Sequence, residues 1–121
     1  MEALEAETIR QRIATLNDQF RAKGLGNGWL LSQAVRSLDA ETLVKLLEMI
    51  QQQQFMGSAE GNDAYGEHDF GSIGLGRGEE YFWKIDYFDH EQKFHSADPS
   101  NPCVTRRVMT VMKADEDEVA K

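Results

Sequence analysis

The stretch from Tyr65 to Asp89, YGEHDFGSIGLGRGEEYFWKIDYFD, constrains the fold more than any other part of the chain. Two segments rich in aromatic residues flank a Gly-Arg-Gly sequence centred on Arg77. Apolar residues that alternate on either side of a glycine-rich turn are typical of a β-hairpin. We therefore expect an antiparallel hairpin over residues 68–88 at the centre of the fold, with Arg77-Gly78 as its turn.

The position of the turn also predicts which residues of the hairpin lie opposite each other, because side-chain register follows turn geometry. The expected pairs are Phe70 with Ile85, Asp69 with Asp86, and His68 with Tyr87. Strand alternation places Tyr81, Trp83, Ile85 and Tyr87 on one side, and Phe82, Lys84, Asp86 and Phe88 on the other. The first side is more apolar, so we expect it to pack against helices.

Two N-terminal helices are predicted from the spacing of apolar residues. Residues 3–23 carry an apolar stripe at steps of four, three and four, formed by Ile9, Ile13, Leu16 and Phe20. Gly24 suits the left-handed position that ends such a helix. Asp39 is a favourable N-cap for a second helix, whose stripe is Leu43, Leu46, Leu47 and Ile50. Residues 29–32 form a short apolar run that we interpret as a strand.

Residues 102–113 fit either a helix or a strand. Asn101-Pro102 resembles an N-cap followed by proline at the first helical position, and Val104, Val108 and Val111 recur at helical spacing. The same segment is rich in β-branched residues and alternates as a strand does. We favour the helix and keep the strand as the alternative. The expected fold is one α+β domain over residues 1–121, with a small antiparallel sheet and an acidic tail at 115–121.

The negative charge of the chain is concentrated around the hairpin. The net charge is −8. Residues 1–54 hold seven acids and six bases, whereas residues 60–91 hold nine acids and two bases. Such a field repels nucleic-acid phosphates and attracts basic surfaces. We therefore expect no direct nucleic-acid binding and a protein partner with a basic surface.

The sequence favours a cytoplasmic protein. No apolar run approaches the roughly 20 residues that a membrane-spanning helix needs, so no membrane partner is expected. The acidic N-terminus lacks the basic start and apolar block of a signal peptide. Cys103 is the single cysteine, which excludes an internal disulfide and fits a reducing compartment.

One group of residues could carry acid–base or metal chemistry, and it lies in and beside the hairpin: Glu67, His68, Asp69, Asp86, Asp89, His90 and His95. Its spacing matches no HExxH, paired CxxC or EF-hand pattern. If Asp69 and Asp86 face each other, repulsion would raise the pKa of one of them, as in a general acid–base pair. A metal-dependent hydrolase or other enzyme using His68, Asp69 and Asp86 is therefore one alternative. We assign no catalytic residue, metal ligand or cofactor.

The aromatic residues of the hairpin suggest an interaction surface. They lie on both sides of residues 81–88, and a single layer of helices can bury only one of these sides. Phe82 and Phe88, on the other side, would then be covered by another element of the chain or by a partner. Exposed aromatics ringed by acids are typical of protein-binding hot spots. The predicted partner-binding residues are Glu67, His68, Asp69, Phe82, Asp86, Phe88 and Asp89. A structural homodimer joined through the hairpin or the N-terminal helix is a further alternative.

Four motifs span most of the chain: IATLNDQFR (13–21), YGEHDFG (65–71), YFWKIDYFD (81–89) and DPSNPCVTRRVMTVM (98–112). Together they resemble a family of small bacterial proteins that is catalogued as a domain of unknown function and is frequent on proteobacterial plasmids, prophages and other mobile elements. The resemblance carries over no site residues. It implies a non-enzymatic inhibitor or modulator of a host protein, such as an anti-CRISPR or anti-restriction factor that occupies a defence nuclease or surveillance subunit.

Overall fold

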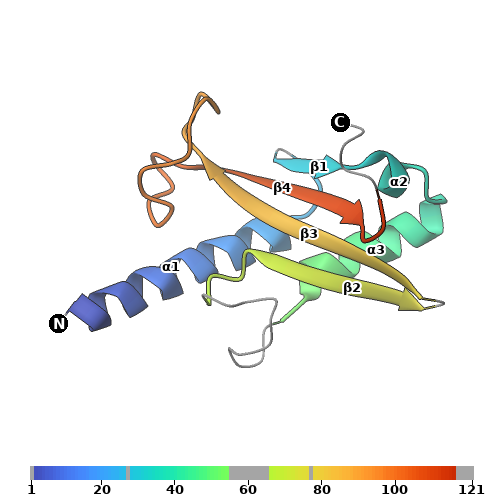
Figure 1. The fold of residues 1–121 in the computed structure, drawn as a ribbon, viewed down its shortest axis with the longest axis horizontal. Helices are drawn as coiled ribbons and strands as arrows, with labels where there is room; N and C mark the ends of the chain where they lie inside the picture. Colours follow the sequence, from blue (N-terminus) through green and yellow to red (C-terminus); the bar gives the residue numbers. More distant parts are fainter. Residues whose placement is uncertain (1, 27, 55–65, 77, 117–121) are drawn as a thin grey trace.

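The computed structural model describes residues 2–26, 28–54, 66–76 and 78–116 and shows an α+β fold, as predicted (Figure 1). Its elements follow in the order α1 (Glu2–Ala22), β1 (Trp29–Leu31), α2 (Gln33–Arg36), α3 (Ala40–Gln52), β2 (Phe70–Gly76), β3 (Glu79–Phe88) and β4 (Arg106–Lys113). The predictions for Tyr65, Arg77 and the last residues of the acidic tail lie outside the described residues.

The four strands form one sheet in the order β1-β4-β3-β2. β2, β3 and β4 are antiparallel neighbours, whereas β1 pairs parallel with β4. The expected antiparallel sheet is therefore confirmed for β2, β3 and β4, and β1 adds a parallel strand at its edge. Figure 1 shows α1 and α3 running along the sheet, and the loop of residues 89–105 (orange) extending beyond it at the left.

The helix boundaries follow the predicted signals. Asp39 is the N-cap of α3, and its carboxylate accepts a hydrogen bond from the backbone N–H of Thr42 at 3.1 Å. Gly24 follows α1 with φ of 85°, and its N–H donates to the carbonyl of Arg21. Glycine adopts this left-handed conformation without steric cost, which explains why α1 ends there.

The C-terminal segment is a strand, so the favoured helix is wrong and the strand alternative is confirmed. β4 lies between β1 and β3 and is hydrogen-bonded to both. The expected N-cap residue, Asn101, instead accepts a hydrogen bond from the N–H of Cys103 within a turn. The β-branched residues of β4 suit a central strand, whose backbone groups form hydrogen bonds with the strands on both sides.

The hairpin register differs by one residue from the prediction. Gly76 lies opposite Glu79, as expected next to the turn, but a bulge between Gly74 and Gly76 shifts the pairs beyond it. Phe70 therefore lies opposite Lys84 and not Ile85. The N–H of Ile85 donates to the carbonyl of Asp69 at 2.8 Å, so the predicted pairs Asp69–Asp86 and His68–Tyr87 are also wrong. A bulge adds one residue to one strand, which moves each later side chain to the opposite side.

The predicted buried side of β3 is confirmed. Tyr81, Trp83 and Ile85 are fully buried in a core shared with residues of α3, such as Leu46 and Ile50. The indole N–H of Trp83 donates to the Gln53 side chain at 2.7 Å. This side of β3 therefore packs against the helices.

The opposite side of the sheet, which we call the outer face, is more open. Cross-strand partners share a side, so the pairing defines its members. They are Leu30, Phe70, Ser72, Glu80, Phe82, Lys84, Asp86, Phe88, Arg106, Val108, Thr110 and Met112. Each of these residues except Val108 is at least partly exposed.

Candidate functional site

The structure distributes the seven predicted partner-binding residues over four places. Glu67 and His68 lie beside α1, and Asp69 lies opposite Ile85, just before β2. Phe82, Asp86 and Phe88 belong to the outer face, and Asp89 begins the loop after β3.

Beside α1, polar side chains form a buried network centred on Asn17, which is fully buried. Its amide nitrogen donates to the carbonyl of Glu67 and to the Tyr87 hydroxyl, both at 2.9 Å. Its amide oxygen accepts from Arg107 Nε at 2.6 Å. Arg107 also donates to the carbonyl of Pro99 at 2.6 Å. Asn17 thus connects α1 to β3, β4 and the segment before β2.

The burial of this network changes the protonation behaviour of Tyr87 and Arg107. Desolvation raises the pKa of Tyr87 far above its usual value, and the charges of Asp69 and Glu67 raise it further. The Tyr87 hydroxyl donates to the Glu67 carboxylate at 3.0 Å. Desolvation also lowers the pKa of Arg107. The Tyr87 phenol therefore stays protonated, and its hydrogen bond to the Glu67 carboxylate has a structural role.

A second part of the network involves Asp18, Arg21 and His68. Arg21 Nη2 and the Asp18 carboxylate form an ion pair at 2.6 Å, and His68 Nδ1 lies 3.0 Å from the same carboxylate. Arg21 is 2% exposed, its guanidinium lies over the Trp83 ring, and it donates to the carbonyls of Ile50 and Gln53. These contacts join α1 to α3, β3 and the segment before β2.

Sequence reasoning missed the network, although α1 contains a signal for it. Asn17 and Arg21 follow Ile13 at steps of four, so they extend its buried stripe. A polar residue on a buried stripe needs a hydrogen-bond partner. The partner Arg107 lies 90 positions away in the sequence, and no local pattern identifies it.

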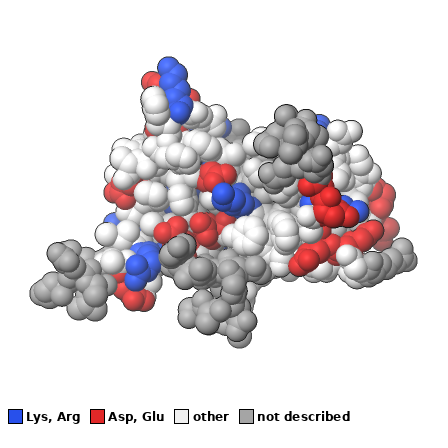
Figure 2. Space-filling model, in the orientation of Figure 1, with Lys and Arg blue, Asp and Glu red and all other residues white. Residues whose placement is uncertain are grey.

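The outer face carries two aromatic pairs and one ion pair. The rings of Phe70 and Phe82 are 5.6 Å apart between centroids. The ring of Phe88 stacks on His95 at 5.5 Å, which attaches the following loop to the sheet. Lys84 and Asp86 form an ion pair at 3.5 Å. In Figure 2, acidic side chains gather at the right, over the turn end of the β2–β3 hairpin.

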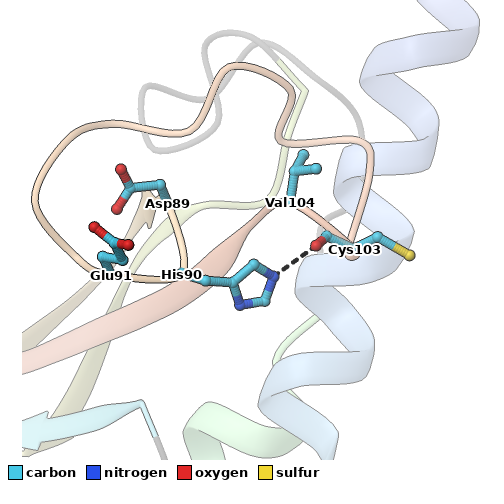
Figure 3. Close-up of a pocket in the computed structure, with 5 residues that line it drawn as sticks. All are labelled: Asp89, His90, Glu91, Cys103 and Val104. Atoms are coloured by element: carbon cyan, nitrogen blue, oxygen red, sulfur yellow. Dashed lines mark hydrogen bonds between the residues drawn. The ribbon is translucent and has the colours of Figure 1, made fainter.

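An open hollow of about 390 Å³ lies in the loop after β3, lined by Asp89, His90, Glu91, Cys103 and Val104. His90 Nε2 is 2.7 Å from the carbonyl oxygen of Cys103. Figure 3 shows the Cys103 sulfur directed away from His90, with the two carboxylates on the opposite side. The sulfur, imidazole and carboxylates of this hollow therefore do not converge on one point.

Within residues 2–26, 28–54, 66–76 and 78–116, no three His, Cys, Asp or Glu side chains are grouped to hold a metal ion. In the same part of the chain, no helix is both long enough and apolar enough to cross a membrane.

Comparison with known proteins places the chain in a family. The model of DUF3768, described as a protein of unknown function, matches residues 31–116. The chain belongs to this family. The match runs from the end of β1 to just past β4, so the DUF3768 segment contains the whole outer face except Leu30. The chain matches no curated protein and no solved structure.

Proposed function

We propose that this DUF3768 protein is a non-enzymatic interaction module whose outer face binds a host protein and inhibits or modulates it. The observation that carries the proposal is the set of partly exposed aromatic residues Phe70, Phe82 and Phe88 on one side of the sheet. Aromatic side chains supply much of the binding energy at protein interfaces. Leu30, which is 56% exposed, extends the apolar surface to the edge strand.

The positions of His68, Asp69 and Asp86 support a binding role over an enzymatic one. The hydrolase alternative needs His68, Asp69 and Asp86 in one site. His68 lies against Asp18, whereas Asp86 belongs to the outer face and pairs with Lys84. Asp69 lies opposite Ile85, whose side chain points into the core. The three groups therefore face different surroundings.

The resemblance described above suggests the setting. Small acidic proteins of mobile elements commonly act by occupying a surface of a host protein. We propose that this protein acts in the cytoplasm of a proteobacterial host, as an anti-CRISPR or anti-restriction factor on a nuclease or surveillance subunit. The excess of acids in residues 60–91 supports a protein target over direct nucleic-acid binding.

Affinity capture with matched variants tests the proposal. Tagged wild-type protein, Phe82→Ser and Leu25→Ser would be used to capture proteins from a proteobacterial lysate, with quantification by mass spectrometry. Leu25 is 57% exposed and lies outside the sheet, so its variant is the control. We expect a host protein whose recovery falls at least about tenfold with Phe82→Ser, since hot-spot truncations cost about 2 kcal/mol or more. Circular dichroism would confirm folding. Equal recovery with all three proteins, or no enriched protein, would contradict the proposal.

A further inference from the structure

We infer that the guanidinium of Arg106 binds a carboxylate of the host protein, supplied by an Asp or Glu side chain. Arg106 belongs to the outer face and lies opposite Phe88, at the end of the face next to the loop of residues 89–105. The inference rests on the proposed function and specifies one contact of that interface.

Arg106 and Arg107 are adjacent in β4, so their side chains lie on opposite sides of the sheet. The guanidinium on the core side has acceptors, because Arg107 donates to the Asn17 side chain and to the carbonyl of Pro99, both at 2.6 Å. Arg106 Nε is also buried, but it has no hydrogen-bond partner among the described residues. Nearly all buried polar groups in folded proteins have a partner, so this nitrogen indicates a missing acceptor.

The two acids of the outer face are not placed to be that acceptor. Asp86 already forms an ion pair with Lys84 at 3.5 Å. Glu80 precedes Phe88 by eight positions along β3, which places it about 26 Å from the Arg106 end of the face. Attraction over that distance is largely screened at physiological salt, where the Debye length is about 8 Å. The positive charge of Arg106 is therefore available to a partner.

The surroundings of Arg106 are mainly apolar. Its cross-strand neighbour Phe88 stacks on His95 at 5.5 Å, and Val108, the next residue of β4 on the same side, is 7% exposed. Arg106 itself is partly exposed, and Nε is its single nitrogen that is both buried and unpaired within the described part of the chain. An incoming group can therefore reach the terminal NH₂ groups. A charge-assisted hydrogen bond is stronger where water is partly excluded.

A carboxylate suits this position better than a phosphate. The planar guanidinium can donate two parallel hydrogen bonds to the two oxygens of a carboxylate. Sites for phosphorylated peptides typically use a cluster of arginines, whereas the other base of the outer face, Lys84, is already paired with Asp86. The net charge of −8 also opposes binding of nucleic-acid phosphates. We therefore expect an acidic residue of the partner, flanked by apolar residues that cover Phe82 and Phe88.

A peptide titration followed by NMR tests the inference with a defined probe. The probe is the synthetic peptide acetyl-Ser-Phe-Glu-Leu-Ser-amide, whose blocked termini leave the Glu side chain as its only carboxylate. Two control peptides carry Gln or phosphoserine in place of Glu. We expect the Glu peptide to shift the Nε–Hε signal of Arg106 saturably, with at least about tenfold weaker binding of the Gln peptide, a difference of about 1.4 kcal/mol. Equal binding of the Glu and Gln peptides, tighter binding of the phosphoserine peptide, or no saturable shift would overturn the inference.

Two arginine variants provide the matched comparison. Arg106→Gln removes the guanidinium from the outer face, whereas Arg12→Gln removes an exposed guanidinium from α1 and changes the net charge equally. We expect Arg106→Gln to weaken binding of the Glu peptide at least about tenfold, and Arg12→Gln to stay within about twofold of wild type. Equal affinities of the two variants would refute the contact. If capture of a host protein depends on Phe82 while Arg106→Gln captures it normally, the docking face stands and the inferred carboxylate contact is wrong.

Thermal unfolding of the free protein separates a binding role of Arg106 from a structural one. Arg106→Met keeps an unbranched apolar stem and removes the unpaired donor. An unsatisfied buried donor costs free energy, so we expect this variant to melt at or above the temperature of wild type. A lower melting temperature would show that Arg106 stabilises the free fold through its own contacts, and would overturn the inference.

Discussion

Replacement of Asn17 by alanine is the sharpest structural test of the α1 network. Asn17 is fully buried and makes three hydrogen bonds, to Glu67, Tyr87 and Arg107. Truncation leaves Arg107 Nε without its acceptor, and an unsatisfied buried group costs about 1–3 kcal/mol. The carbonyl of Glu67 also loses its donor, at about 1 kcal/mol. Alanine favours the helix by about 0.5 kcal/mol, which offsets a small part.

We therefore expect Asn17→Ala to lower the free energy of unfolding by about 2–3 kcal/mol, a large share of the stability of a small domain. The measurement is equilibrium unfolding in urea, where the midpoint should fall by about 1–2 M at unchanged slope. Gln19→Ala, on the exposed side of the same helix, is the control and should stay within about 0.5 kcal/mol of wild type. Equal midpoints for the two variants would refute the network as the connection between α1 and the sheet.

Three further predictions concern packing and protonation. In Gly71→Ala the new Cβ would lie 2.5 Å from Trp83 Nε1, so we expect a loss of about 1–3 kcal/mol in thermal unfolding, whereas Gly74→Ala, with open space around it, should be near neutral. Desolvation raises the pKa of Glu116, but hydrogen bonds with Ser32, Ala34 and Lys113 outweigh it and hold that pKa below its usual value. A lowered folded-state pKa stabilises the fold above the unfolded value of 4.5, so the difference in melting temperature between wild type and Glu116→Gln should shrink from pH 7 to pH 3, and a constant difference would contradict this. Burial raises the pKa of Tyr87, so its stabilising effect should be lost as pH rises above 10, and absorbance titration of wild type against Tyr87→Phe should show no phenolate from Tyr87 while the protein is folded.

The features that the sequence predicted are those set by local patterns. Alternation along β3 identified Tyr81, Trp83 and Ile85 as the buried side, because a strand repeats every two residues. Asp39 and Gly24 marked helix ends, because capping depends on one or two residues.

The errors arose where distant contacts decide the structure. The bulge between Gly74 and Gly76 lies in a glycine-rich run with few side chains to indicate register, so the Asp69–Asp86 pair was misplaced. The local sequence of residues 102–113 fits a helix and a strand about equally well. Residues 106–113 form a strand because they pair with β1 on one side and β3 on the other. The Asn17–Arg107 hydrogen bond joins the two ends of the chain and could not be found from spacing.

We propose that a host protein covers the outer face. Photo-cross-linking in a proteobacterial host tests it most directly, with a benzophenone amino acid placed at Thr110, in the middle of the outer face, or at Val44, which is 52% exposed on α3. We predict a discrete cross-linked adduct with a host protein from position 110 and none of that mass from position 44. No adduct from position 110, or the same adduct from both positions, would contradict the account.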